Sequence, residues 1–152
     1  MSSTYTTSLQ IQKIGTGEQS GIWGNTTNTN WDLIEQAVAG VLSITMLNAN
    51  YTLTVVNGAS DESRNMVLQV TGTNSAVRQV IAPLVPKVYV VYNNTTGGYN
   101  VTVKVSGQTG VIIKAGKKAI VYTNSTDVIE VANAPVTEDG AQTLTGKTMS
   151  GS

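Results

Sequence analysis

The sequence contains no cysteine and no histidine. Without cysteine the chain cannot form a disulfide, a thiolate metal site or a cysteine nucleophile. Without histidine it also lacks the usual general base, the commonest metal ligand and the relay group of serine hydrolases. We therefore expect a protein that is not an enzyme and that has no catalytic residue, no metal site and no bound cofactor.

Charge is also scarce. Charged residues make up 12% of the chain, and nine basic residues balance nine acidic ones. This is about half the charged share that is usual in soluble domains. The basic doublet Lys117-Lys118, with Lys114 nearby, is too small to neutralise a run of phosphates, and a solvated turn is the simpler interpretation. The composition predicts no nucleic-acid partner.

Long hydrophobic runs are absent too. No stretch of about 18 apolar residues could cross a bilayer, and residues 1–20 lack the basic start and apolar centre of a secretory signal. A hydrophobic content of 40% still suits one globular core. We expect a protein that is made in a cytoplasm and does not insert into a membrane.

The N-terminal region changes character once. Residues 1–29 are rich in Ser, Thr, Asn and Gly, which predicts an extended arm. From Asn30 the pattern predicts a short helix, with Asn30 or Asp32 as the cap, Glu35 completing a capping box, and Gly40 as a left-handed stop. Because so short a helix is marginal alone, it must pack against a body.

From residue 41 the apolar residues alternate with polar ones, as in half-buried strands. Tyr99–Val105 is the clearest strand, and the loops 93–98 and 115–117 are expected to close hairpins. Nine strands are expected in all, at 41–47, 51–56, 65–71, 77–82, 87–92, 99–105, 110–114, 118–123 and 127–131. The prediction is an all-β fold, an antiparallel β-sandwich or jelly-roll-like domain.

Two groups of acidic residues require separate interpretation. Asp61 and Glu62 lack the alternating oxygen ligands of a calcium loop, so we expect them in a solvated hairpin tip. Glu130, Glu138 and Asp139 would have to face one another across a cleft to hydrolyse a glycoside. The last two fall in an apparent linker, which favours a protein without an active site.

Some large apolar residues lie in segments that have no core of their own. Such side chains tend to dock on partners, and exposed tryptophans often anchor interfaces. The alternative is that the two tryptophans attach the arm and helix to the body. The candidate partner-binding residues are Ile11, Ile14, Ile22, Trp23, Trp31, Leu144 and Met149.

The stretch Gly21–Ala37 has a Trp-Gly step, an Asn-rich turn and a helical segment. In this it resembles the N-terminal, virion-proximal region of phage tail fibre proteins and closely related tail structural proteins. The segments Val80–Pro83 and Tyr89–Gly97 are similar to parts of the β body in such proteins. Gln142–Met149 is similar to the Thr-Leu-Thr-x-Lys-Thr element of fibre shafts.

The resemblance implies a virion structural protein, a tail fibre segment that anchors the host-recognition fibre to the tail. It implies a homotrimer, made in the bacterial host cytoplasm and located in the virion tail. Residues 1–40 would be an attachment arm that binds other tail proteins, and 41–134 a β-sandwich. Residues 135–152 would be a linker and the start of the shaft, while regions not seen here would contact the host surface receptor.

Two other functions remain open at this point. A carbohydrate-binding β-sandwich module could use tyrosine rings as sugar platforms, and the available rings are Tyr89, Tyr92, Tyr99 and Tyr122. A head decoration or capsid fibre protein would share the fold and differ in its location on the particle.

Overall fold

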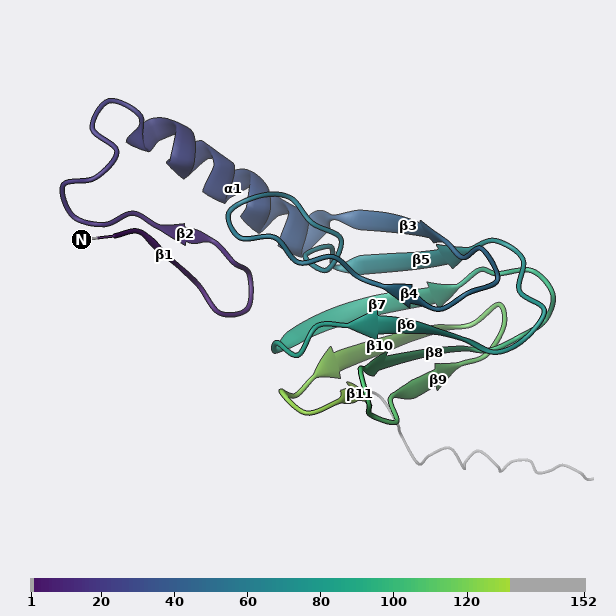
Figure 1. The fold of residues 1–152 in the computed structure, drawn as a ribbon. Coiled ribbons are helices and arrows are strands. Elements are labelled where there is room, and N and C mark those ends of the chain that lie inside the picture. The colour runs from purple at the N-terminus through teal and green to yellow at the C-terminus, as the bar shows by residue number, and fades with distance from the viewer. Residues whose placement is uncertain (1, 132–152) are drawn as a thin grey trace, which may run out of the picture.

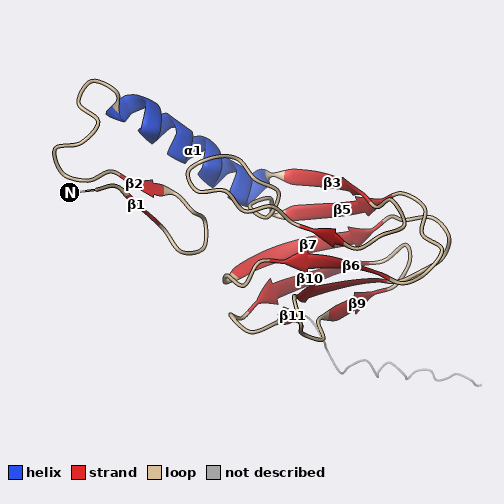
Figure 2. Ribbon diagram, in the orientation of Figure 1, coloured by secondary structure: helices blue, strands red, loops and turns tan. Residues whose placement is uncertain are grey.

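A computed structural model describes residues 2–131, in which strands predominate and one helix is present (Figures 1 and 2). This confirms the prediction of a β-rich chain with a single helix; the predictions for 135–152 lie outside the described residues. The chain begins with a hairpin of β1 (Thr4–Tyr5) and β2 (Gln12–Lys13), followed by helix α1 (Trp23–Ala39). The remaining strands are β3 (Val41–Thr45), β4 (Tyr51–Thr52), β5 (Val67–Thr71), β6 (Arg78–Ala82), β7 (Lys87–Asn93), β8 (Val101–Val105), β9 (Val111–Ile113), β10 (Lys118–Thr123) and β11 (Val128–Glu130).

These nine strands form two mixed sheets, with the orders β11-β10-β7-β5-β3 and β4-β6-β8-β9. From β3 to β8 each loop reverses the chain and crosses to the other sheet. Every second strand therefore runs in the same direction, so that β3, β5 and β7 pair in parallel, as do β4, β6 and β8. Only the pairs of β8 with β9, β7 with β10 and β10 with β11 are antiparallel within the two sheets. The expectation of an antiparallel fold was wrong, because alternation shows which side chains face inward but not which strands pair.

Both expected hairpins were wrong for the same reason. The loop 93–98 leads from β7 in one sheet to β8 in the other, and the loop 115–117 leads from β9 back to β10. The buried side chain of Asn93 bridges the first crossing. Its amide donates to the carbonyl oxygens of Ile113 at 2.9 Å and Tyr99 at 3.2 Å. A side chain thus connects the sheets where their backbones do not pair.

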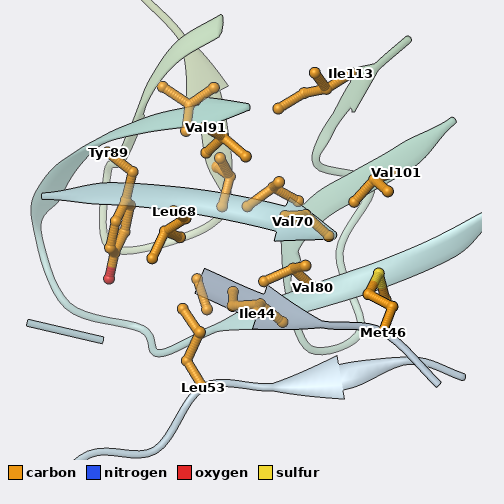
Figure 3. Packing of buried hydrophobic residues seen from close by; sticks show 14 of the residues in the cluster. Ile44, Met46, Leu53, Leu68, Val70, Val80, Tyr89, Val91, Val101 and Ile113 are labelled. Atoms are coloured by element: carbon orange, nitrogen blue, oxygen red, sulfur yellow. The ribbon is translucent and has the colours of Figure 1, made fainter. Parts of the chain in front are cut away.

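The inward side chains of both sheets form one hydrophobic cluster (Figure 3). Burial of each large member contributes on the order of 1.5–3 kcal/mol of transfer free energy. The fully buried side chains include Leu68, Val70, Val80, Tyr89, Val91, Val101, Val103 and Val121. This shared core holds the two sheets together.

Helix α1 is longer than the predicted segment and begins at Trp23. Asn30 and Asp32 therefore lie inside the helix and do not cap it, and Ile22 occupies the N-cap position. Thr and Asn are weak helix formers. However, the Asn30 side chain accepts a hydrogen bond from the backbone N–H of Gln12 at 3.2 Å and donates to its carbonyl at 2.8 Å. Contact with the β1-β2 hairpin thus favours helix where local propensity does not.

Gly40 ends the helix in an extended conformation, with φ −66° and ψ 135°, and not in the expected left-handed one. A Cβ at this position would collide with the carbonyl oxygen of Gln36 and lie 2.6 Å from Oδ1 of Asn65. Glycine is needed here for space, since the loop before β5 packs directly on the helix end.

Candidate functional site

The N-terminal hairpin is attached to the loop 53–66, which connects β4 to β5. The N–H of Gly58 donates to the carbonyl of Gln10 at 2.8 Å, and Nε of Arg64 donates to the carbonyl of Leu9 at 2.9 Å. Arg64 also forms an ion pair of 3.2 Å with Asp61. We call this contact region the polar joint.

The carboxylate of Asp61 is fully engaged within the polar joint. Oδ1 accepts from the N–H of Arg64 at 2.8 Å and from the hydroxyl of Ser63 at 3.0 Å, and Oδ2 accepts from the N–H of Val56 at 2.9 Å. The predicted solvated tip was wrong, because the loop folds back over the core. The charges of Asp61 and Arg64 are buried and therefore require these partners.

Two further elements, α1 and β7, contribute to the joint, together with Asn65 of the loop. Gln36 of α1 donates to the carbonyl of Asp61 at 2.9 Å, and the Asn65 side chain donates to the same carbonyl at 3.1 Å. The hydroxyl of Tyr89, on β7, donates to the carbonyl of Ser63 at 3.0 Å. The hairpin, the helix, the loop and the five-stranded sheet are thereby connected at one place.

Lys87 lies next to the joint, with its amine 4.9 Å from the centroid of the Tyr89 ring. Burial lowers the pKa of Lys87 to about 8; Asp61 opposes this effect, and the positive charge of Arg64 adds to it. Burial also raises the pKa of Tyr89, and the carboxylate of Asp61 raises it further. Both effects follow from the cost of charge in a weakly solvated place.

A cavity of about 400 Å³ opens beside the joint, lined mainly by Gln36, Leu42, Thr54, Ser60, Glu62 and Asn65. Burial opposes ionisation of Glu62, but hydrogen bonds from the Tyr51 hydroxyl and from Thr54 give this carboxyl a lowered pKa. Among the described residues, Oε1 of Gln36 is buried without a hydrogen-bond partner. The cavity offers carboxylate, amide and hydroxyl groups to a polar ligand.

The predicted partner-binding residues fall into three groups. Ile22, Trp23 and Trp31 are 56%, 61% and 63% exposed. Ile11 and Ile14 are partly buried. Leu144 and Met149 lie outside the described residues. The exposure of both tryptophans disfavours the alternative in which they attach the arm to the body.

The exposed side of helix α1 carries two large apolar residues, with Glu35 between them. Leu33 is its buried residue, whereas Val38 is 67% exposed. Trp31 and Val38 are seven residues apart and so lie on the same side of the helix. The exposed side of α1 can therefore serve as a contact surface of its own.

A second apolar surface was not predicted. Eight outward apolar side chains of the five-stranded sheet form what we call the outer face: Val41, Val67, Val88, Val90, Ile120, Tyr122, Ile129 and Val131. The same side of the sheet also carries the polar residues Ser43, Thr45, Gln69, Thr71 and Lys118. The sequence did contain an indication of this surface, since residues 88–92 are an unbroken apolar run. Such runs are typical of strands covered on both faces, in contrast to the alternation seen in 101–105.

Protein-family models, curated proteins and solved structures give no match to this chain. Within residues 2–131 no helix has the length and apolar character that crossing a bilayer would take. In the same part of the chain, no three acidic side chains come together as ligands for a metal ion. The features of the molecule that bear on its function are therefore the two apolar surfaces, the polar joint and the cavity.

Proposed function

We propose that the chain is a virion structural protein, a phage tail fibre segment that anchors the host-recognition fibre to the tail. The observation that supports this most is the exposure of Trp23 and Trp31, at 61% and 63%. Helix α1 and the hairpin extend from one end of the two sheets (Figure 1). Exposed aromatic side chains on a projecting element are suited to anchor an interface.

In this proposal residues 1–40 bind other tail proteins, and 41–134 form a rigid, jelly-roll-like β-sandwich block. Residues 135–152 begin the fibre shaft. Three copies assemble around the fibre axis in the virion tail after synthesis in the bacterial host cytoplasm, and several fibres on one particle add avidity to weak receptor contacts. The polar joint would transmit force from arm to block. No reaction or cofactor is involved.

The test is incorporation into particles. The double variant Trp23→Ala with Trp31→Ala should be absent from purified virions, as measured by immunoblot, while its urea unfolding midpoint stays unchanged. Ile112→Ala is the matched control, because Ile112 is 62% exposed on β9, away from the arm. Normal incorporation of the tryptophan variant would refute the anchoring role. Imaging of labelled particles would distinguish a tail location from a head decoration protein.

A carbohydrate-binding module is the second candidate, and the polar cavity beside the joint favours it. Tyr89 cannot be a sugar platform because it is 0% exposed, whereas Tyr99 is 40% exposed. Glycan-array binding by the full chain that is lost in Glu62→Gln would support this candidate. If the wild-type chain bound no glycan on the array, the structural role would remain preferred.

A further inference from the structure

The outer face is organised in register across the five-stranded sheet. Val41 pairs with Val67, Val67 with Val90, and Val90 with Ile120. The N–H of Val131 donates to the carbonyl of Ile120 at 2.8 Å, which extends this aliphatic row to the last strand. Val88, Tyr122 and Ile129 form a second row beside it, since Tyr122 pairs with both of the others.

The four-stranded sheet treats its outward positions differently. Gln79, Thr102 and Lys104 occupy the middle of its outward side, next to Ile81 and Ile112, which pair with Lys104 and Thr102. On the five-stranded sheet the corresponding positions of β7 and β10 are Val88, Val90, Ile120 and Tyr122. The two sheets share a core, but on the five-stranded sheet the outward apolar side chains are contiguous across all five strands.

The sequence of β7 also indicates that the outer face is covered. A strand that is buried on both faces reads as a continuous apolar run, and β7 has apolar side chains on both faces. The described residues cover one face of this sheet.

We propose that a second copy of this chain covers the outer face. This deepens the tail fibre proposal, on which it rests for its biological setting, by naming the surface through which copies associate. Val41, Ile120 and Val131 are 63%, 47% and 53% exposed. With their neighbours they expose an apolar area of roughly 500 Å², at the upper end of what monomers leave in water.

Val38, at the end of α1, precedes Val41 of β3 by three residues and is 67% exposed. A stable interface buries roughly 800 Å² per partner, so the outer face would supply the larger part of such an interface. Among the described outward positions of the sheet the charged residue is Lys118, at the margin, with its amine 4.0 Å from the ring centroid of Tyr92. The formal net charge of the chain is +0. Charge therefore does not oppose the approach of two copies, and so apolar a face is typical of interfaces between identical chains.

The first test measures the mass of the full chain by light scattering during gel filtration. Wild type and Ile112→Lys should elute at a multiple of 15.9 kDa, and Ile120→Lys should fall to the single-chain mass. Ile112 is the matched control, an exposed isoleucine on the outward side of the other sheet. Circular dichroism checks that Ile120→Lys remains folded, and Ile120→Thr provides a milder variant if it does not.

The second test needs no substitution. Tyr122 and Tyr99 are 37% and 40% exposed in a single chain. In wild type, nitration by tetranitromethane should modify Tyr99 and spare Tyr122.

A monomeric wild type, an unchanged mass of Ile120→Lys, or equal nitration of both tyrosines would overturn the inference. A monomeric wild type in which Tyr122 is protected from nitration would also overturn the inference. It would mean that residues 132–152 of the same chain cover the outer face. The tail fibre proposal fails separately, if the Trp23→Ala with Trp31→Ala variant still enters particles.

Discussion

Asp61 and Arg64 form an ion pair of 3.2 Å in which each side chain is 1% exposed. The guanidinium also binds the carbonyl of Leu9, so that the pair connects the N-terminal hairpin to the body. Burying two charges costs free energy that only close pairing and additional hydrogen bonds offset. The pair is therefore a sensitive point of the fold, although the loop that carries it has the composition of an ordinary turn.

Asp61→Ala should lower the free energy of unfolding by about 3–5 kcal/mol, because it leaves a buried guanidinium without its counter-charge. Urea titration at neutral pH measures this. Adding Arg64→Met should recover part of the loss, since the uncompensated charge is then gone. Glu130→Ala, at an exposed carboxylate on β11, is the control and should change stability by less than about 0.5 kcal/mol. An Asp61→Ala protein as stable as this control would contradict the role of the ion pair.

Lys87 should make stability depend on alkaline pH. Its folded pKa, about 8, lies below the ordinary value of 10.5, so between these values the unfolded chain binds more protons than the folded one. The free energy of unfolding should therefore rise with pH in this window. The rise should be about 1 kcal/mol, since solvent screens the partly exposed amine and so reduces the effect of its pKa shift. Above about pH 10 the raised pKa of Tyr89 acts in the opposite direction, and stability should fall again.

Urea midpoints measured between about pH 8 and about pH 10 would show this rise in wild type and in the control Lys114→Met, whose lysine is exposed. The rise should be missing in Lys87→Met. If Lys87→Met kept the full rise, another group would be responsible.

Gly58 should control how firmly the hairpin is attached. It has φ +66°, and a Cβ there would lie 2.9 Å from Cε1 of Tyr5. Gly116 has a similar φ of +74°, with no atom of the described residues within 4 Å of such a Cβ. Alanine at either position costs about 1 kcal/mol for the left-handed backbone, but only Gly58→Ala displaces Tyr5.

Hydrogen exchange should therefore accelerate at the hairpin amides in Gly58→Ala, for example at Thr6, whose N–H donates to the carbonyl of Ile11 at 2.9 Å. In Gly116→Ala these amides should exchange at the wild-type rate. Equal exchange in both variants would mean that the contact between Gly58 and Tyr5 does not hold the hairpin.

The positions of the strands could be predicted from the sequence, but their partners could not. The predicted segment 118–123 coincides with β10, and 77–82 and 87–92 each differ from a strand by one residue at one end. Alternation of apolar and polar residues is a local property, and it decides which side chains turn inward. Pairing depends on the route of each loop, and a loop that crosses to the other sheet has the same Gly- and Asn-rich composition as a hairpin turn.

Of the candidate surfaces, too, some could be predicted from the sequence and others could not. Ile22, Trp23 and Trp31 could be selected from the sequence because they are large apolar residues in a polar segment. The outer face could not, because its residues come from five strands that meet only in the folded sheet. The polar joint was missed as well, since it brings together residues as distant in sequence as Leu9 and Arg64.

By itself the sequence determined that this protein is β-rich and builds its core without disulfides or histidine chemistry, since residue type and local periodicity are sufficient for that. Tertiary structure alone decided that the strands form mixed sheets, that Asp61 and Arg64 are buried, and that one sheet keeps an apolar outer side. These features depend on which distant segments come into contact. Such contacts are selected by the free energy of the whole packed chain and not by any short stretch of it.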